Sequence, residues 1–199
     1  MSSEIKVTNI KHSSSGSNNL VLASDGSATI GQISSSSVFP AGGTGNPISV
    51  AVIADEKGHN DQGGTSYTSF TQRTLNTVLY DSEGTNGTVT ISSNKFTLGA
   101  GTYLIQWSAA AYQANGHASL LYNVTGTADL KNGSTEYTGS SGNVTNRSVG
   151  SVIHTITTNN EYEIRHRVNS ALGTYGMGVA HGWSGYNNYY TIVVISKLK

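Results

Sequence analysis

Residues Asn94–Tyr112 read NKFTLGAGTYLIQWSAAAY, and this stretch decides the fold class. It predicts a short strand over Lys95–Leu98, a glycine turn, and a long strand over Thr102–Tyr112. Side chains alternate across a strand, so one face of the long strand is apolar: Tyr103, Ile105, Trp107, Ala109 and Ala111. The opposite face is small and mixed. The rest of the chain should cover the apolar face.

Further strands are predicted from Pro47 onward, each bounded by turn residues. They are Ile48–Ala54, Thr74–Tyr80, Thr88–Ile91, Ala118–Val124, Ser134–Thr138, Ser148–Thr157, Glu161–Val168 and Tyr190–Leu198. No segment shows a helical period of 3.6 residues. Roughly ten short strands separated by turns predict an all-β sandwich or jelly roll.

Composition narrows the classes of function. The 199 residues carry 11 basic and 11 acidic side chains, so neither a nucleic acid nor a cationic partner is expected. The chain has no cysteine, which excludes disulfides, thiolate metal sites and cysteine nucleophiles. Met1 is followed by a polar segment, so we expect no Sec-type signal peptide, and no apolar run is long enough to insert into a membrane.

Residues 1–46 differ from the remainder. SSSGSNN and ISSSSVF are low-complexity, and AGGTGNP interrupts the chain like a linker. Between them, LVLASDGSATI predicts a hairpin around Asp25-Gly26. A lone hairpin is not stable in water, so the segment either needs partners or is a disordered tail. We therefore predict an N-terminal attachment and oligomerisation segment, residues 1–46, and a head domain, residues 47–199.

Two features suggest self-association of the head. Ile48–Ala54 and Tyr190–Leu198 are apolar on both faces, although one face of a sandwich strand normally meets water. A third strand carries acids and bases on one face: Glu161, Glu163, Arg165 and Arg167. The simpler interpretation of these charges is a solvated face with local pairing. The alternative is complementary charge repeated about a symmetry axis, which makes them candidate trimer-interface residues.

Several blocks occur in order along the head. They are ADEKG (Ala54–Gly58), GGT (Gly63–Thr65), RTLNTVLYD (Arg73–Asp81), SSNKFTLGAGTYLIQWSAAAY (Ser92–Tyr112), HASLLYNVT (His117–Thr125) and YEIRHRV (Tyr162–Val168). Together they resemble the C-terminal head domain of tail fibres and related virion proteins of tailed bacteriophages, over Ile48 to Leu198. That family is similar to the trimeric jelly rolls of the complement and tumour-necrosis-factor type.

The resemblance implies a homotrimer on the virion that meets the host surface, with residues 1–46 docked on another virion protein. A tail fibre or fibre tip is the first expectation, made in the host cytoplasm and mounted on the tail or capsid surface. A capsid decoration or head fibre without a ligand is the alternative. The host partner would be a cell-surface polysaccharide or lipopolysaccharide.

The sequence departs from the family pattern in the loop GTYGMGVAHGWSGYNNYY, Gly173–Tyr190. Aromatic faces with nearby amides are the usual components of a sugar-binding surface. The candidate ligand-binding residues are Tyr175, Trp183, Tyr186, Asn187 and Asn188. Alternatively, Trp183 and one or two tyrosines plug the end of the sandwich or a subunit seam.

Two other groups of polar residues contain possible metal ligands. Asp55–Asp61, DEKGHND, lacks the spacing of an EF-hand and is better explained as a polar solvated turn. His117, His154 and His166 could supply one imidazole per chain on a three-fold axis, but packed, hydrogen-bonded histidines are the simpler explanation. We therefore expect no metal and no cofactor.

Catalysis has little support. The chain has no G-x-S-x-G elbow, H-E-x-x-H or P-loop. Glu161 and Glu163 share a face but lie beside arginines, unlike a glycosidase pair. We expect non-catalytic contact with the host, with polysaccharide cleavage as a minor alternative.

Overall fold

A computed structural model describes residues 9–10, 20–22, 28–30, 48–84 and 87–198. The chain divides into two compact units, Met1–Pro47 and Ile48–Lys199. Every regular element in the described residues is a β-strand. The described part of the chain contains no helix that could cross a membrane.

The described residues of the first unit form one antiparallel sheet. Its strands are β1 (Asn9–Ile10), β2 (Leu20–Leu22) and β3 (Ala28–Ile30), in the order β1-β2-β3. Leu20 lies opposite Ile30, as the predicted hairpin requires. The predicted Asp25-Gly26 turn and the low-complexity runs lie outside the described residues. The attachment role of residues 1–46 stays a prediction.

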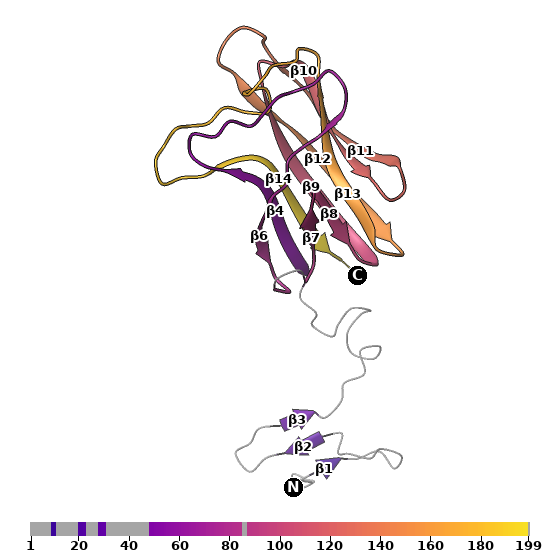
Figure 1. The fold of residues 1–199 in the computed structure, drawn as a ribbon. Helices are drawn as coiled ribbons and strands as arrows, with labels where there is room; N and C mark the ends of the chain where they lie inside the picture. The colour runs from indigo at the N-terminus through magenta and orange to yellow at the C-terminus, as the bar shows by residue number, and fades with distance from the viewer. Residues whose placement is uncertain (1–8, 11–19, 23–27, 31–47, 85–86, 199) are drawn as a thin grey trace, which may run out of the picture. The chain divides into compact units, whose positions relative to one another are not determined.

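The second unit is built from two antiparallel sheets that face each other (Figure 1). The first, which we name the β9 sheet, has the order β12 (Thr145–Ile156), β9 (Gly101–Tyr112), β14 (Asn188–Lys197), β4 (Ser49–Lys57) and β6 (Thr77–Asp81). The second, the β13 sheet, has the order β11 (Ala128–Thr138), β10 (Asn115–Asn123), β13 (Asn160–Val168), β8 (Lys95–Leu98) and β7 (Thr90–Ser92). β5 (Thr71–Gln72) also pairs with β13.

All ten predicted strands are present, but only β8 has the predicted bounds at both ends, and two of the other differences have a clear structural reason. The short strand predicted over Ser134–Thr138 in fact begins at Ala128. Its first half could not be recognised in the sequence, because an exposed edge strand with polar side chains has no apolar alternation. The strand predicted from Thr74 begins at Thr77, because Arg73 and Leu75 turn into the interior instead.

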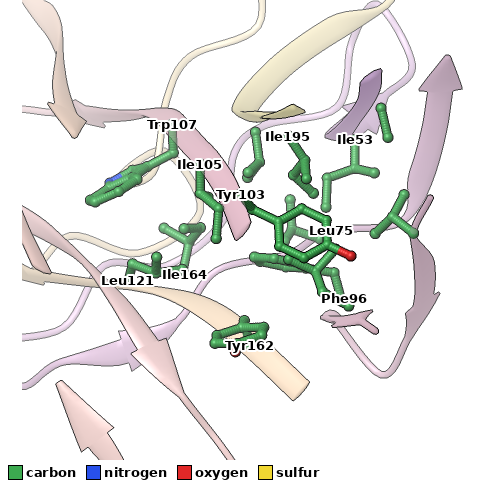
Figure 2. Packing of buried hydrophobic residues seen from close by; sticks show 14 of the residues in the cluster. Ile53, Leu75, Phe96, Tyr103, Ile105, Trp107, Leu121, Tyr162, Ile164 and Ile195 are labelled. Carbon is green, nitrogen blue, oxygen red and sulfur yellow. The ribbon is translucent and has the colours of Figure 1, made fainter. Parts of the chain in front are cut away.

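The main apolar core fills the space between the sheets (Figure 2), and Ala111, Ala114 and Val168 form a small second cluster. Ile105 and Ile195 enter it from the β9 sheet, while Leu121 and Ile164 enter from the β13 sheet. Burying a side chain of this size stabilises the folded state by about 1.5–3 kcal/mol. The core is therefore the main source of stability in this unit.

The alternation predicted for β9 is confirmed. Its five predicted core side chains are all buried, from Tyr103 to Ala111. Trp107 also joins the two sheets, because its Nε1 donates a hydrogen bond to Ser119 Oγ at 2.8 Å. Gly150 lies opposite Trp107 on β12, where a Cβ atom would overlap the indole.

The outer face of the β9 sheet is apolar but only partly covered within the chain. Val149 and Ile153 on β12 are 51% and 65% exposed, and Tyr80 on β6 is 56% exposed. Between them, Val52 and Val194 pair side by side and are half-buried. The doubly apolar strands therefore have one face in the core and the other face toward solvent in a single chain.

Candidate functional site

Two loops pack together at one end of the head. Residues 58–70 follow β4, and residues 169–187 precede β14. Backbone hydrogen bonds join them, from Gly63 N to Gly178 O at 2.9 Å and from Gly64 N to Thr174 O at 2.8 Å. A Cβ on Gly63 would collide with the Met177 backbone, so this close approach requires glycine.

A buried arginine fixes this pair of loops to the sheet. Arg73 is 1% exposed, and its guanidinium donates to the carbonyl oxygens of Ala110, Met177 and Tyr190 at 2.9, 3.2 and 3.2 Å. It also donates to Thr191 Oγ1 at 2.9 Å and contacts the Met177 sulfur. Burial lowers the pKa of Arg73 to about 10, so it stays charged at neutral pH.

The RTLN block of the resemblance therefore has a structural explanation. Arg73 holds the loops, and Leu75 is buried in the core. Asn76 bonds the Glu56 backbone twice, accepting from its N–H and donating to its carbonyl oxygen, both at 2.8 Å. Sequence reasoning did not select Arg73 as a key residue, although a single arginine in a block of otherwise core and turn residues was the available signal.

The predicted ligand-binding residue Asn188 lies under the loop. It is 4% exposed, donates to Gly58 O at 2.7 Å and accepts from His181 N at 3.1 Å. Its amide is therefore engaged within the chain, where it supports the loop that carries Trp183.

Exposed aromatic rings cover the outside of this loop. Trp183 is 68% exposed and Tyr186 is 67% exposed, and the His181 ring stacks on Trp183 with centroids 5.1 Å apart and planes 33° apart. Trp183 N also donates to His181 Nδ1 at 2.9 Å. We call His181, Trp183 and Tyr186 the aromatic platform. Tyr175 is exposed on the preceding turn of the same loop.

A carboxylate stands beside the platform. Glu56 Oε1 accepts from Asn187 Nδ2 at 2.6 Å and from the Tyr189 hydroxyl at 3.1 Å. The hydrogen bond from Asn187 holds the pKa of the Glu56 carboxyl below its usual value, so the group is ionised at neutral pH. Asn187, unlike Asn188, lies on the exposed surface.

The four candidate interface charges lie on β13, away from the apolar outer face. Glu161 pairs with Lys95 at 2.7 Å, and Glu163 pairs with Arg165 at 2.5 Å. Arg165 also lies over the Tyr122 ring, 3.3 Å from its centroid, whereas Arg167 is exposed. These contacts fit the local-pairing interpretation; the interface role stays a prediction.

Within the described residues of one chain, no three His, Cys, Asp or Glu side chains come together as a candidate metal site. The alternative of one imidazole per chain on a three-fold axis stays a prediction. His117 Nδ1 and His166 Nε2 are 2.9 Å apart, and His117 Nε2 lies 2.5 Å from Asn146 Oδ1. Asp55 is not part of a solvated turn, because it is 1% exposed on β4, where burial raises the pKa of its carboxyl.

Two antiparallel sheets around one core define this unit as an all-β jelly-roll sandwich. No protein-family model and no curated protein matches the chain. Among solved structures, the globular domain of zebrafish complement 1qA protein matches with a TM-score of 0.50 and 13% identity, over 77% of this chain and 98% of that chain. The fold predicted from the sequence is thereby confirmed as a C1q/TNF-like jelly roll.

Other solved structures match over a similar range. Murine APRIL matches with a TM-score of 0.47 and 11% identity, over 76% of this chain and 100% of that chain. Eiger TNF from S. frugiperda matches with a TM-score of 0.49 and 11% identity, over 77% of this chain and 94% of that chain.

Proposed function

We propose that this chain is a virion protein of a tailed bacteriophage, a tail fibre or fibre tip, whose trimeric head binds a host-surface glycan without catalysis. The order of sequence blocks from Ala54 to Val168 supports the virion origin. The aromatic platform supports recognition, because large exposed rings with adjacent amide and carboxylate groups suit the apolar and hydroxyl surfaces of a sugar.

The observation that carries the proposal is the position of the platform on the head. β4 begins at Ser49, next to the first residue of the unit, and ends at Lys57, where the loop 58–70 starts. Nine residues of strand span about 30 Å. Asn188 pairs with Lys57 and Lys197 pairs with Ser49, so the platform loop lies at the Lys57 end (Figure 1).

This geometry suits a receptor-binding head. If residues 1–46 attach to the particle, the chain enters the head at the Ser49 end. The aromatic platform then lies at the far end, where it can reach a cell surface.

Self-association through the outer face of the β9 sheet is part of the proposal. From Val149 to Ile153 on β12, and across Gln106, Val194 and Val52, the face carries no charged side chain. Exposed apolar area of this kind is usually buried against a partner. Two further copies of this chain can cover it around a three-fold axis, because a face without charged side chains meets the surface of a neighbouring copy without charge repulsion. Multivalency would then raise a weak affinity at each platform.

Absence of catalysis fits the carboxylates on β13. Glu161 is bonded to Lys95, and Glu163 accepts from both Arg165 and Gln72. A glycosidase needs a general acid with a raised pKa that faces a second carboxylate across the substrate. Glu161 and Glu163 are instead bonded to neighbouring cationic or amide groups.

Adsorption competition tests the proposal. Purified full-length protein, added to host cells before the particles, should slow adsorption. The double variant Trp183→Ala/Tyr186→Ala should lose this effect, while Tyr137→Ala should keep it. Tyr137 is a matched control because it is 70% exposed and lies on β11, the edge strand of the other sheet (Figure 1). Equal blocking by the double variant and the wild type would contradict recognition by the platform.

A capsid decoration without a ligand is the second candidate function. The observation that favours it is the internal bonding of the loop, in which Asn188 and Arg73 seal the end of the sandwich. No effect of the wild-type protein on adsorption, together with a capsid location, would support this function.

A further inference from the structure

We infer that the aromatic platform binds an uncharged pyranose, stacked on the Trp183 indole, and that His181 is the positioning residue for this indole. The inference rests on the proposed glycan recognition and specifies its ligand class. The indole is held in place, a carboxylate is available to a hydroxyl group, and the surrounding loops carry no lysine or arginine.

The Trp183 indole is exposed but lies against the His181 ring, with the ring planes tilted by 33°. The backbone N–H of Trp183 also donates to His181 Nδ1 at 2.9 Å. His181 N in turn donates to Asn188 Oδ1 at 3.1 Å, and Asn188 Nδ2 donates to Gly58 O at 2.7 Å. The indole is therefore connected through His181 to the buried end of β14. An aromatic ring held in its bound orientation loses little conformational entropy on binding.

A hydrogen-bond acceptor is bonded to the loop that carries the indole. Asn187, four residues after Trp183, donates to Glu56 Oε1 at 2.6 Å. A carboxylate has about four acceptor sites, and Asn187 and Tyr189 occupy only part of this capacity. The Glu56 carboxylate can therefore accept a hydrogen bond from a sugar hydroxyl.

The charges of the loops favour a neutral sugar over an anionic one. The loops 58–70 and 169–187 contain one acid, Asp61, and neither lysine nor arginine. Lys57 Nζ donates to the carbonyl oxygens of Gln62 and Gly63, both at 3.1 Å. Arg147 donates to Ser108 and to the carbonyl oxygens of Tyr189 and Tyr190. A sialic or uronic acid would therefore meet Glu56 and Asp61 without an available cation.

Saturation-transfer NMR on the full-length protein tests the ligand class. The probes are methyl β-galactopyranoside and methyl β-glucopyranoside, compared with the methyl glycosides of N-acetylneuraminic acid and glucuronic acid. We expect transfer to the ring C–H protons of a neutral probe and none to the acidic probes. Trp183→Ala should reduce the signal by at least about tenfold. Tyr137→Ala should leave it unchanged.

The positioning role of His181 has its own measurement. The chain has 2 tryptophans, and Trp107 is 3% exposed, so Trp183→Phe isolates the emission of Trp183 by difference. In His181→Ala, the anisotropy of Trp183 emission should fall and the neutral-sugar signal should weaken. The thermal unfolding midpoint should change no more than it does in Tyr137→Ala. Unchanged anisotropy with an unchanged sugar signal would overturn the positioning role.

The remaining outcomes separate the ligand class from recognition itself. Trp183-dependent binding to host cells with transfer only to acidic probes, or to no probe, overturns the ligand class and leaves recognition standing. Neutral-sugar transfer that survives Trp183→Ala also overturns it. A wild-type protein that shows neither cell binding nor saturation transfer to any sugar overturns the ligand class and the proposed function together.

Discussion

The Arg73 guanidinium donates a hydrogen bond to the carbonyl oxygen of Tyr190, with Nη2 and the oxygen 3.2 Å apart. The same group bonds Ala110 O on β9 and Met177 O in the platform loop. One fully buried cation thus satisfies backbone acceptors from segments far apart in sequence. The aromatic platform depends on this contact, because Met177 precedes Trp183 in the same loop.

Replacing Arg73 should therefore destabilise the head. Arg73→Met leaves carbonyl oxygens unpaired and removes one of the two positive charges near Asp55, the other being Lys57. It should lower the free energy of unfolding by about 3–5 kcal/mol. Urea denaturation at fixed protein concentration measures this change. Arg167→Met, at an exposed position on β13, should change it by no more than about 0.5 kcal/mol. Equal effects of the two substitutions would show that Arg73 does not hold the loops.

Acid should destabilise the fold through its buried histidines. Burial, with the charges of Arg73 and His117, lowers the pKa of His166 to about 2, and burial also lowers the pKa of His117. The unfolded chain takes up protons near the ordinary value of 6.5, whereas the folded chain does not. Stability is therefore greatest above 6.5 and falls as the pH drops below it.

Urea denaturation between about pH 7.5 and about pH 5 measures this fall, with a slope approaching roughly 1.4 kcal/mol per pH unit for each histidine. Asp55 acts in the opposite direction, because burial raises the pKa of its carboxyl above the ordinary 3.8. His166→Gln should flatten the slope. A free energy of unfolding that is constant over this range would contradict the prediction.

Gly150 should not tolerate a side chain. A Cβ at this position would overlap the Trp107 indole, which packs in the core and bonds Ser119. Gly150→Ala should destabilise the head by about 1–3 kcal/mol, as overpacking usually does. Gly173→Ala is the matched control, because a Cβ there meets no atom within 4 Å. Thermal unfolding compares the two, and similar midpoints would contradict the packing described here.

Charges on the outer face of the β9 sheet should separate the subunits. Val149→Glu/Ile153→Glu places two carboxylates on exposed apolar positions, so the folded chain should sediment as a monomer while the wild type sediments as a trimer. Tyr137→Glu on β11 should stay trimeric. A wild-type protein that is monomeric at micromolar concentration, or a double variant that stays trimeric, would show that this face is not the interface.

The sequence predicted correctly those strands that are determined by the pattern of neighbouring residues. β8 has the predicted bounds, and the alternation of β9 correctly selected its buried face, because strand periodicity is a property of neighbouring residues. β11 was predicted too short, since Ala128–Thr138 is mostly exposed and carries no apolar alternation. The uninterrupted apolar runs of β4 and β14 correctly indicated that the outer face of their sheet is apolar as well as the inner face.

The candidate site was predicted in part. Trp183 and Tyr186 are exposed as expected for binding residues, because no apolar periodicity draws them into the core. Asn188 could not be distinguished from Asn187 in sequence, since only the register of β14 against β4 turns one amide inward. The contributions of Arg73 and Glu56 depend on contacts between segments far apart in sequence, and only the lone arginine of the RTLN block hinted at one of them. The role of His181 depends on how its own loop folds, which has no periodic pattern.

A reconstruction of the particle tests the central claim most directly, because it shows which end of the head faces outward. We predict a trimer of heads on the tail, with the Ser49 end of β4 toward the particle and the loop containing Trp183 at the outermost surface. A head whose Trp183 loop is buried against another virion protein, or particles that contain no copy of this chain, would contradict the account.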